Sequence, residues 1–164
     1  MNRLLKFFPE MTVATLAVRF FGLRKIPLLA YVRPSIIAFD STKLVIKIPL
    51  RRRTKNHLNC MYFGALAIGA DAAGGVLAMH LIQQSGHRVS LIFKSLDARF
   101  LKRAEGDVYF TCADGAGITE LINKAVLSDE RVEMPMNVTA TVPGELGDEP
   151  VAEFTLVLSL RKRD

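Results

Sequence analysis

The sequence has few of the residues that build disulfide or metal scaffolds. Its 164 residues contain only two cysteines, too few for a disulfide framework in a chain of this size. We therefore expect reduced thiols and a cytoplasmic location. Neither cysteine lies at a zinc-ligand spacing from any of the three histidines, so no metal site is predicted.

Long uninterrupted hydrophobic runs are also missing. A membrane-spanning helix needs roughly 18–20 uncharged apolar residues, and a secretory leader needs an unbroken apolar stretch. Pro9, Glu10 and Arg19 interrupt the N-terminal apolar segment. We expect neither a cleaved leader nor a membrane span.

Acidic residues are scarce in the first third of the chain. Residues 1–55 hold 12 Lys/Arg against two acids, whereas residues 56–164 hold 10 Lys/Arg against 14 acids. Such a basic segment suits an anionic cofactor, a membrane surface or nucleic acid. The chain has no nucleic-acid recognition motif and no interleaved aromatic and basic residues. A nucleic-acid partner is therefore not expected.

The N-terminal segment, residues 1–34, is predicted to be helical and separate from the main domain, residues 35–164. Residues 2–22 are typical of one or two short amphipathic helices that end at Gly22. Two interpretations stay open for residues 1–25. The helix packs on the domain, or it lies weakly on a membrane surface with its basic side chains, such as Arg19, Arg24 and Lys25, at the headgroups.

The main domain alternates between strands and helices. Residues 35–50 are typical of a hairpin, and apolar alternation predicts strands at 89–101, 107–113, 132–142 and near the C-terminus, with a turn at Glu105-Gly106. Residues 116–127 have the pattern of an inserted amphipathic helix. Residues 60–84 are rich in Ala and Gly and apolar on all sides, which indicates a long buried helix. These elements predict an α+β domain in which a strongly curved antiparallel sheet wraps around that helix.

Two features of the long helix could support chemistry. Asp71 is its one charged residue, and a carboxylate in a buried helix is costly unless it is paired or lies at a cleft. It is either a general base or nucleophile, or a structural acid at a subunit boundary. The free N–H groups at the helix start, near Phe63 and Gly64, can polarise a carbonyl oxygen. Asn56, just before the helix, either orients water or substrate or is a turn residue.

The segment from Asn56 to Asp71 resembles the signature of hotdog-fold thioesterases of the phenylacetic-acid-pathway type. That signature is an asparagine, then His-Gly-Gly six residues on, then an acid nine residues after the histidine. Here Tyr62-Phe63-Gly64 stands at the His-Gly-Gly position. The segment from Phe100 to Asp107 is similar to the family's turn, with Arg103 in place of its proline. The likeness is strongest to a bacterial hotdog subfamily of thioesterase-like proteins of unknown function.

The resemblance implies a hotdog fold and an acyl-CoA or acyl-carrier-protein thioesterase. It implies that the Phe63 N–H, beside Gly64, polarises the thioester carbonyl, that Asp71 acts across a dimer interface, and that Asn56 places water or substrate. Tyr62 would line the substrate site. Coenzyme A would enter only as part of the substrate, with no separate cofactor. Lys102, Arg103 and Arg52 are implied as its contacts, although the Arg51–Arg53 run is equally typical of a solvated loop.

Along one helix Gly64 and Asp71 are roughly 10 Å apart, so a single helix cannot place both groups on one reacting atom. We therefore expect a homodimer, or a tetramer, in which the start of one helix meets the middle of another. The alternative is a non-catalytic hotdog module that binds acyl groups or a membrane surface, since Phe63 is large enough to narrow the channel.

Overall fold

The computed structural model describes residues 10–163, so Leu4, Phe7 and Phe8 of the expected N-terminal helix lie outside it. The helices are α1 (Glu10–Lys25), α2 (Pro27–Tyr31), α3 (Phe63–Ser85), α4 (Gly115–Val126) and α5 (Pro143–Leu146). The strands are β1 (Ser35–Phe39), β2 (Leu44–Ile48), β3 (Val89–Phe100), β4 (Val108–Cys112), β5 (Val132–Thr141) and β6 (Pro150–Lys162).

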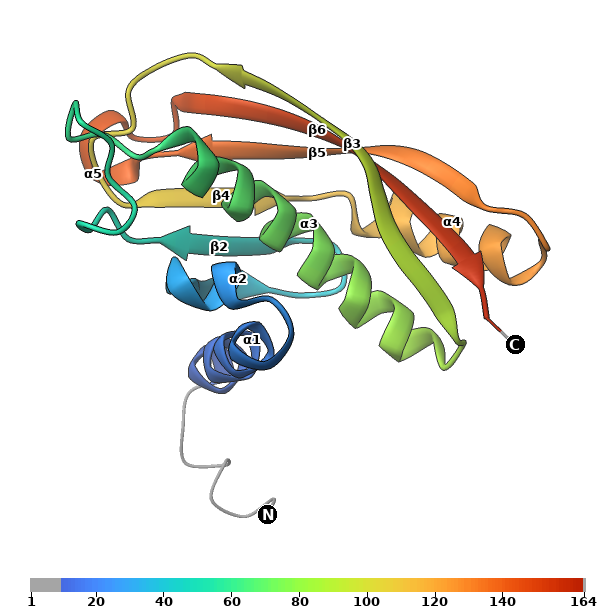
Figure 1. Cartoon of the computed structure of the whole chain (residues 1–164). Coiled ribbons are helices and arrows are strands. Elements are labelled where there is room, and N and C mark those ends of the chain that lie inside the picture. The colour runs from blue at the N-terminus through green and yellow to red at the C-terminus, as the bar shows by residue number, and fades with distance from the viewer. Residues whose placement is uncertain (1–9, 164) are drawn as a thin grey trace.

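All six strands form one antiparallel sheet in the order β1-β2-β4-β5-β6-β3. The long helix α3 crosses one face of this sheet, and the strands curve around it (Figure 1). The inserted helix α4 packs on β5, β6 and α3. The predicted fold class, an α+β hotdog fold with a curved sheet around a long central helix, is confirmed.

One local prediction needs correction, and two connections have features that the sequence did not reveal. Gly22 does not end the first helix, because α1 continues to Lys25 and a Cβ at Gly22 would lie 2.9 Å from the backbone nitrogen of Ala30. That glycine instead lets α2 fold back closely. The segment around Gly106 connects two strands that are not neighbours in the sheet, because β3 pairs with β6 while β4 pairs with β2 and β5. The turn before β6 contains the short helix α5.

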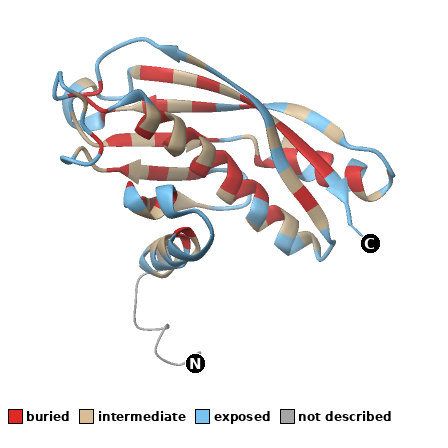
Figure 2. Cartoon of the chain, in the orientation of Figure 1, coloured by how far each residue is buried: buried red, intermediate tan, exposed pale blue. Residues whose placement is uncertain are grey.

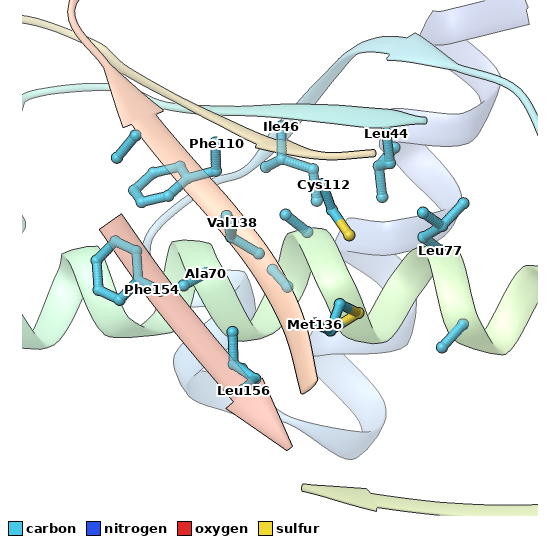
Figure 3. Close-up of a cluster of buried hydrophobic side chains, with 14 of the residues drawn as sticks. Leu44, Ile46, Ala70, Leu77, Phe110, Cys112, Met136, Val138, Phe154 and Leu156 are labelled. Carbon is cyan, nitrogen blue, oxygen red and sulfur yellow. The ribbon is translucent and has the colours of Figure 1, made fainter. Parts of the chain in front are cut away.

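The small residues of α3 allow the sheet to approach its backbone. A Cβ at Gly69 would lie 2.3 Å from Cζ of Phe110, and one at Gly74 would lie 2.0 Å from Cε of Met136. Both partners are completely buried, and Figure 3 shows them facing the helix. Packing therefore compensates for the roughly 1 kcal/mol that each helical glycine costs. Gly86, at a φ of 70°, ends the helix.

By length and hydropathy alone α3 also meets the criterion for crossing a bilayer, with a mean hydropathy of 1.6 over its best 18 residues. However, 61% of that window is buried inside the protein. Figure 2 shows buried residues along much of α3, which crosses the face of the sheet. The helix owes its apolar character to the core it fills.

The two edge strands of the sheet, β1 and β3, differ in how far other parts of the chain cover them. At the β1 edge, the hydroxyl of Thr15 in α1 accepts a hydrogen bond from the Ile36 N–H at 2.8 Å, and Arg19 donates to the Pro34 carbonyl and the Ser35 hydroxyl. The β3 edge is twelve residues long and, within residues 10–163, pairs only with β6. Native proteins rarely leave an edge this long uncovered, so β3 is available to a further strand.

The contact between Gly69 and Phe110 leads to a stability prediction. Replacing Gly69 by Ala should lower the free energy of unfolding by about 1–2 kcal/mol, because overpacking against a buried ring exceeds the gain in helix propensity. Urea unfolding would measure the change. Gly144→Ala is the matched control, since its added methyl group meets no atom within 4 Å. Equal stability of the two variants would contradict the close packing of α3.

Candidate active site

The start of α3 is fixed by backbone hydrogen bonds from two loops. The Tyr62 N–H donates to the Thr54 carbonyl and the Met61 N–H donates to the Ala104 carbonyl, both at 2.8 Å. Thr54 is itself buried, and its hydroxyl donates to the Pro49 carbonyl at 2.8 Å. These bonds join the segment that begins at Asn56 to the turn that follows Phe100. The two sequence motifs therefore meet in space at the helix start.

The first amides of α3 are left without acceptors. Tyr62 is the N-cap and makes no side-chain cap, while its carbonyl accepts the N–H groups of Ala65 and Leu66. Within residues 10–163, no hydrogen bond is donated by the N–H of Phe63 or Gly64. Free amides at the positive end of a helix favour developing negative charge on a nearby oxygen.

Aromatic rings surround these amides. The Tyr62 ring lies over Gly64, where an added Cβ would be 2.5 Å from its Cε1. Only glycine therefore admits the ring at this position. The Phe63 ring lies 4.7 Å from Tyr62 and 6.4 Å from Phe100, centre to centre. The helix start is thus bordered by apolar, aromatic surface.

A pocket of about 540 Å³ opens beside these rings. It brings together five of the predicted site residues, namely Asn56, Tyr62, Phe63, Lys102 and Arg103. Gly64 adjoins it under the Tyr62 ring, whereas Asp71 and Arg52 do not line it. The pocket is lined by aromatic rings and by two cationic side chains, which suits a molecule with an apolar part and an anionic part.

Asn56 lines the pocket but uses its side chain within its own loop. Its Oδ1 accepts the Leu58 N–H at 2.9 Å, and its Nδ2 donates to the Cys60 sulfur at 3.2 Å. This is the turn geometry typical of asparagine. Its role in placing water or substrate stays a prediction.

The three predicted cationic contacts lie in different surroundings. Lys102 forms an ion pair with Glu149, and its N–H donates to the Val151 carbonyl. Arg103 is exposed and has no carboxylate partner among residues 10–163. Arg52 lies in a separate arginine-rich pocket with Tyr31. Arg103 is therefore the cation at the site that is freest to meet an anion.

Asp71 lies half-buried on α3, eight residues and roughly 12 Å beyond Phe63. Its carboxylate makes no hydrogen bond or ion pair with any residue in the described part of the chain. Burial raises the pKa of the Asp71 carboxyl above its usual value, because the charged form loses hydration. An unpaired acid of raised pKa is suited to accept a proton.

Sequence reasoning missed several residues of the pocket. His57, Cys60, Leu66 and Phe100 also line it. Phe100 belongs to the Phe100–Asp107 turn motif, so that motif could have indicated Phe100 as a residue of the pocket. Asp107, the last residue of that motif, accepts the Leu50 N–H at 2.9 Å and pairs with Lys47 at 3.3 Å. Its observed contacts hold the end of β2 beside the site.

Among residues 10–163, no group of three or more His, Cys, Asp or Glu side chains is arranged to hold a metal ion.

The chain belongs to a family described as a domain of unknown function, DUF4442, whose model matches residues 15–154. A comparison with curated proteins finds no match.

Several solved structures share the fold. A Pseudomonas aeruginosa protein of unknown function, described as a probable thioesterase, has a TM-score of 0.76 at 24% identity, covering 91% of this chain and 96% of its own. A Chlorobaculum tepidum protein of unknown function has a TM-score of 0.77 at 13% identity, with coverages of 93% and 97%. A Haemophilus influenzae thioesterase has a TM-score of 0.66 at 12% identity, with coverages of 87% and 88%.

The raised pKa of Asp71 predicts a pH-dependent effect on stability. A carboxyl whose pKa is higher in the folded state than in the unfolded state holds its proton more tightly when folded, so stability falls as pH rises through that range. Asp71→Asn removes this penalty and should raise the free energy of unfolding at neutral pH. The gain should fade as pH falls toward 3.8, the ordinary value for this group.

Denaturant-induced unfolding of wild type and Asp71→Asn across this pH range would measure the difference in their free energies of unfolding. A variant less stable than wild type at neutral pH would show that Asp71 is held by a favourable structural contact.

Proposed function

We propose that the protein hydrolyses an acyl-thioester, carried by coenzyme A or an acyl-carrier protein, at a site shared between two copies of the chain. The observation that carries this proposal is that two polar groups of α3 form no hydrogen bond within the described part of the chain. The free Phe63 N–H and the unpaired Asp71 carboxylate lie on the same helix. Several structures with this fold carry thioesterase names, which supports the assignment of the reaction class.

The proposed chemistry uses each group once. The Phe63 N–H binds the thioester carbonyl oxygen and stabilises the negative charge that develops there. Asp71 accepts a proton from water as the water oxygen bonds to the carbonyl carbon. The carbon–sulfur bond then breaks, and the thiol leaves with the proton held by Asp71. Direct attack by the Asp71 carboxylate, followed by hydrolysis of the anhydride, is the other route open to the same group.

A second copy supplies the geometry that one chain lacks. Register with β6 places Leu96, Ala98 and Phe100 of β3 on the core face of the sheet. Leu96 is nonetheless 42% exposed and Phe100 51% exposed. Pairing of two β3 edges would continue the sheet and cover these side chains. It would also set two α3 helices against each other, start to middle.

The pocket supports the same substrate class. An acyl group suits its aromatic lining, and the phosphates of coenzyme A or a carrier protein suit the side chains of Arg103 and Lys102. The alternative of a non-catalytic acyl-binding module would use the same pocket, and activity measurements distinguish the two.

The role of Asp71 is tested by Asp71→Asn. Loss of the general base should lower kcat for acyl-CoA hydrolysis by about 100-fold or more, measured over a panel of acyl chain lengths. Asp129→Asn is the matched control, because Asp129 is an exposed loop acid. Unchanged hydrolysis by the Asp71 variant would refute the assigned mechanism, and absence of hydrolysis by wild type on every acyl-thioester would favour the binding module.

The role of the Phe63 N–H is tested by Phe63→Pro. Proline is tolerated at the first position of a helix, and Tyr62, at ψ 137°, already has the extended conformation that a following proline requires. The variant should fold, lose the amide donor, and lower kcat by roughly 100- to 1,000-fold. Phe63→Ala keeps the amide and removes the ring, so it should retain far more activity. Equal losses in both variants would assign the effect to the ring.

A further inference from the structure

Six large apolar side chains are exposed between Leu16 and Tyr31. None of them lines the pocket at the start of α3 or belongs to β3. We call them the apolar ridge; they are Leu16, Phe20, Leu23, Ile26, Leu28 and Tyr31. Phe20 is 65% exposed, Leu23 72% and Leu28 64%. Figure 2 shows how much of α1 and α2 is open to solvent on the side away from the sheet.

Three residues of the ridge lie on the exposed face of α1, and the other three lie at or in α2. Leu16, Phe20 and Leu23 recur at helical spacing on one side. Val18 and Gly22 are buried on the other side, toward β1 and α2. The helix is therefore apolar on two faces, and only one of them is covered by residues 10–163. A contiguous exposed apolar surface is typical of an interaction site.

Cations border the ridge. Arg24 lies over the Phe20 ring with its Cζ 5.8 Å from the centre, and Arg53 lies over the Tyr31 ring at 5.0 Å. Arg53 also donates to the Tyr31 carbonyl at 3.1 Å. Beyond Tyr31, a pocket of about 670 Å³ is lined by four arginines, Arg33, Arg51, Arg52 and Arg53. Tyr31 belongs to both the ridge and this pocket, so the ridge adjoins the arginine-lined pocket.

Among residues 10–163, these cations have no carboxylate partner. The four ion pairs among residues 10–163 involve Lys47, Lys94, Arg99 and Lys102. None involves the four pocket arginines, Arg24 or Lys25. Residues 11–39 contain no acid at all. Within the described part of the chain, no ion pair therefore neutralises the positive charge around the ridge.

We propose that the apolar ridge and the arginine pocket dock the protein on an anionic phospholipid bilayer. Leu16, Phe20, Leu23 and Leu28 enter the boundary between headgroups and acyl chains, while the pocket arginines bind headgroup phosphates. Apolar side chains flanked by unpaired cations are the combination that binds helices to such interfaces. Arg19, expected from the sequence to face the headgroups, instead holds the β1 edge.

The charge pattern selects a bilayer over a protein partner. A protein interface that buries cations usually offers specific carboxylates to meet them. A bilayer needs only a protruding apolar surface surrounded by positive charge, and that is the surface present here. The surface is also separate from the β3 edge, so docking is compatible with the proposed dimer.

Sedimentation of the full chain with vesicles tests this proposal. The protein should sediment with phosphatidylcholine vesicles that contain phosphatidylglycerol, remain in solution with pure phosphatidylcholine, and be released by high salt. Leu23→Ser and Phe20→Ser should each weaken binding several-fold. Replacing Arg51, Arg52 and Arg53 together by Gln should weaken it by tenfold or more.

Two matched controls make the result specific. Leu127→Ser changes a leucine that is 89% exposed on the opposite part of the molecule. Changing Arg161, Lys162 and Arg163 together to Gln removes the same number of charges from the C-terminal strand. Both controls should bind as wild type does.

Three results would overturn the proposal. They are an absence of wild-type binding to anionic vesicles, equal loss of binding in the controls, or a smaller assembly on size-exclusion chromatography when Leu23 is changed to Ser. The last result would mean that the ridge joins protein chains. Leu23 is so exposed that Leu23→Ser should keep the wild-type melting transition, which circular dichroism would check. If Phe20→Ser unfolds, the vesicle binding of Leu23→Ser alone decides the outcome.

Discussion

The close approach of the sheet to the backbone of α3 is the constraint on which the rest of the structure depends. Gly69 and Gly74 leave room for Phe110 and Met136 to lie directly on the helix. Only a helix with so few large side chains can be enclosed by a curved sheet in this way. The same packing fixes where the first amides of α3 lie, because its start is also bonded to the Thr54 and Ala104 carbonyls. Fold and site are therefore consequences of one packing arrangement.

That arrangement also leaves one edge of the sheet, strand β3, without a neighbouring strand among residues 10–163. α1 covers the β1 edge through Thr15 and Arg19, whereas β3 keeps an open edge with Leu96 and Phe100 exposed. Asp71 and the Phe63 amide are separated by roughly 12 Å of helix. A second copy added at β3 would satisfy the open edge and the divided site together. A dimer is preferred to a site within one chain because one added copy would both pair the β3 edge and bring the two groups together.

Much of the fold could be predicted from the sequence. The Ala- and Gly-rich composition of residues 60–84 identified the central helix, and two-residue alternation identified the strands. Their pairing could not be predicted, because β3 and β4 are adjacent in sequence and separated in the sheet. Gly22 was misread because a glycine that permits close helix packing looks the same in sequence as one that ends a helix. Motif spacing found Asn56, Phe63 and Asp71, but it could not show that Asn56 bonds within its own loop or that Arg52 lies in a different pocket.

The most direct test of the shared site is complementation between two inactive variants. Phe63→Pro keeps Asp71, and Asp71→Asn keeps the Phe63 amide, so a mixed dimer contains one intact site if each site takes one group from each chain. Co-refolding equal amounts of the two variants should restore about a quarter of wild-type thioesterase activity, since half of the dimers are mixed and each has one working site. Activity that stays at the level of the separate variants, with mixed dimers present by mass, would contradict a site built from two chains.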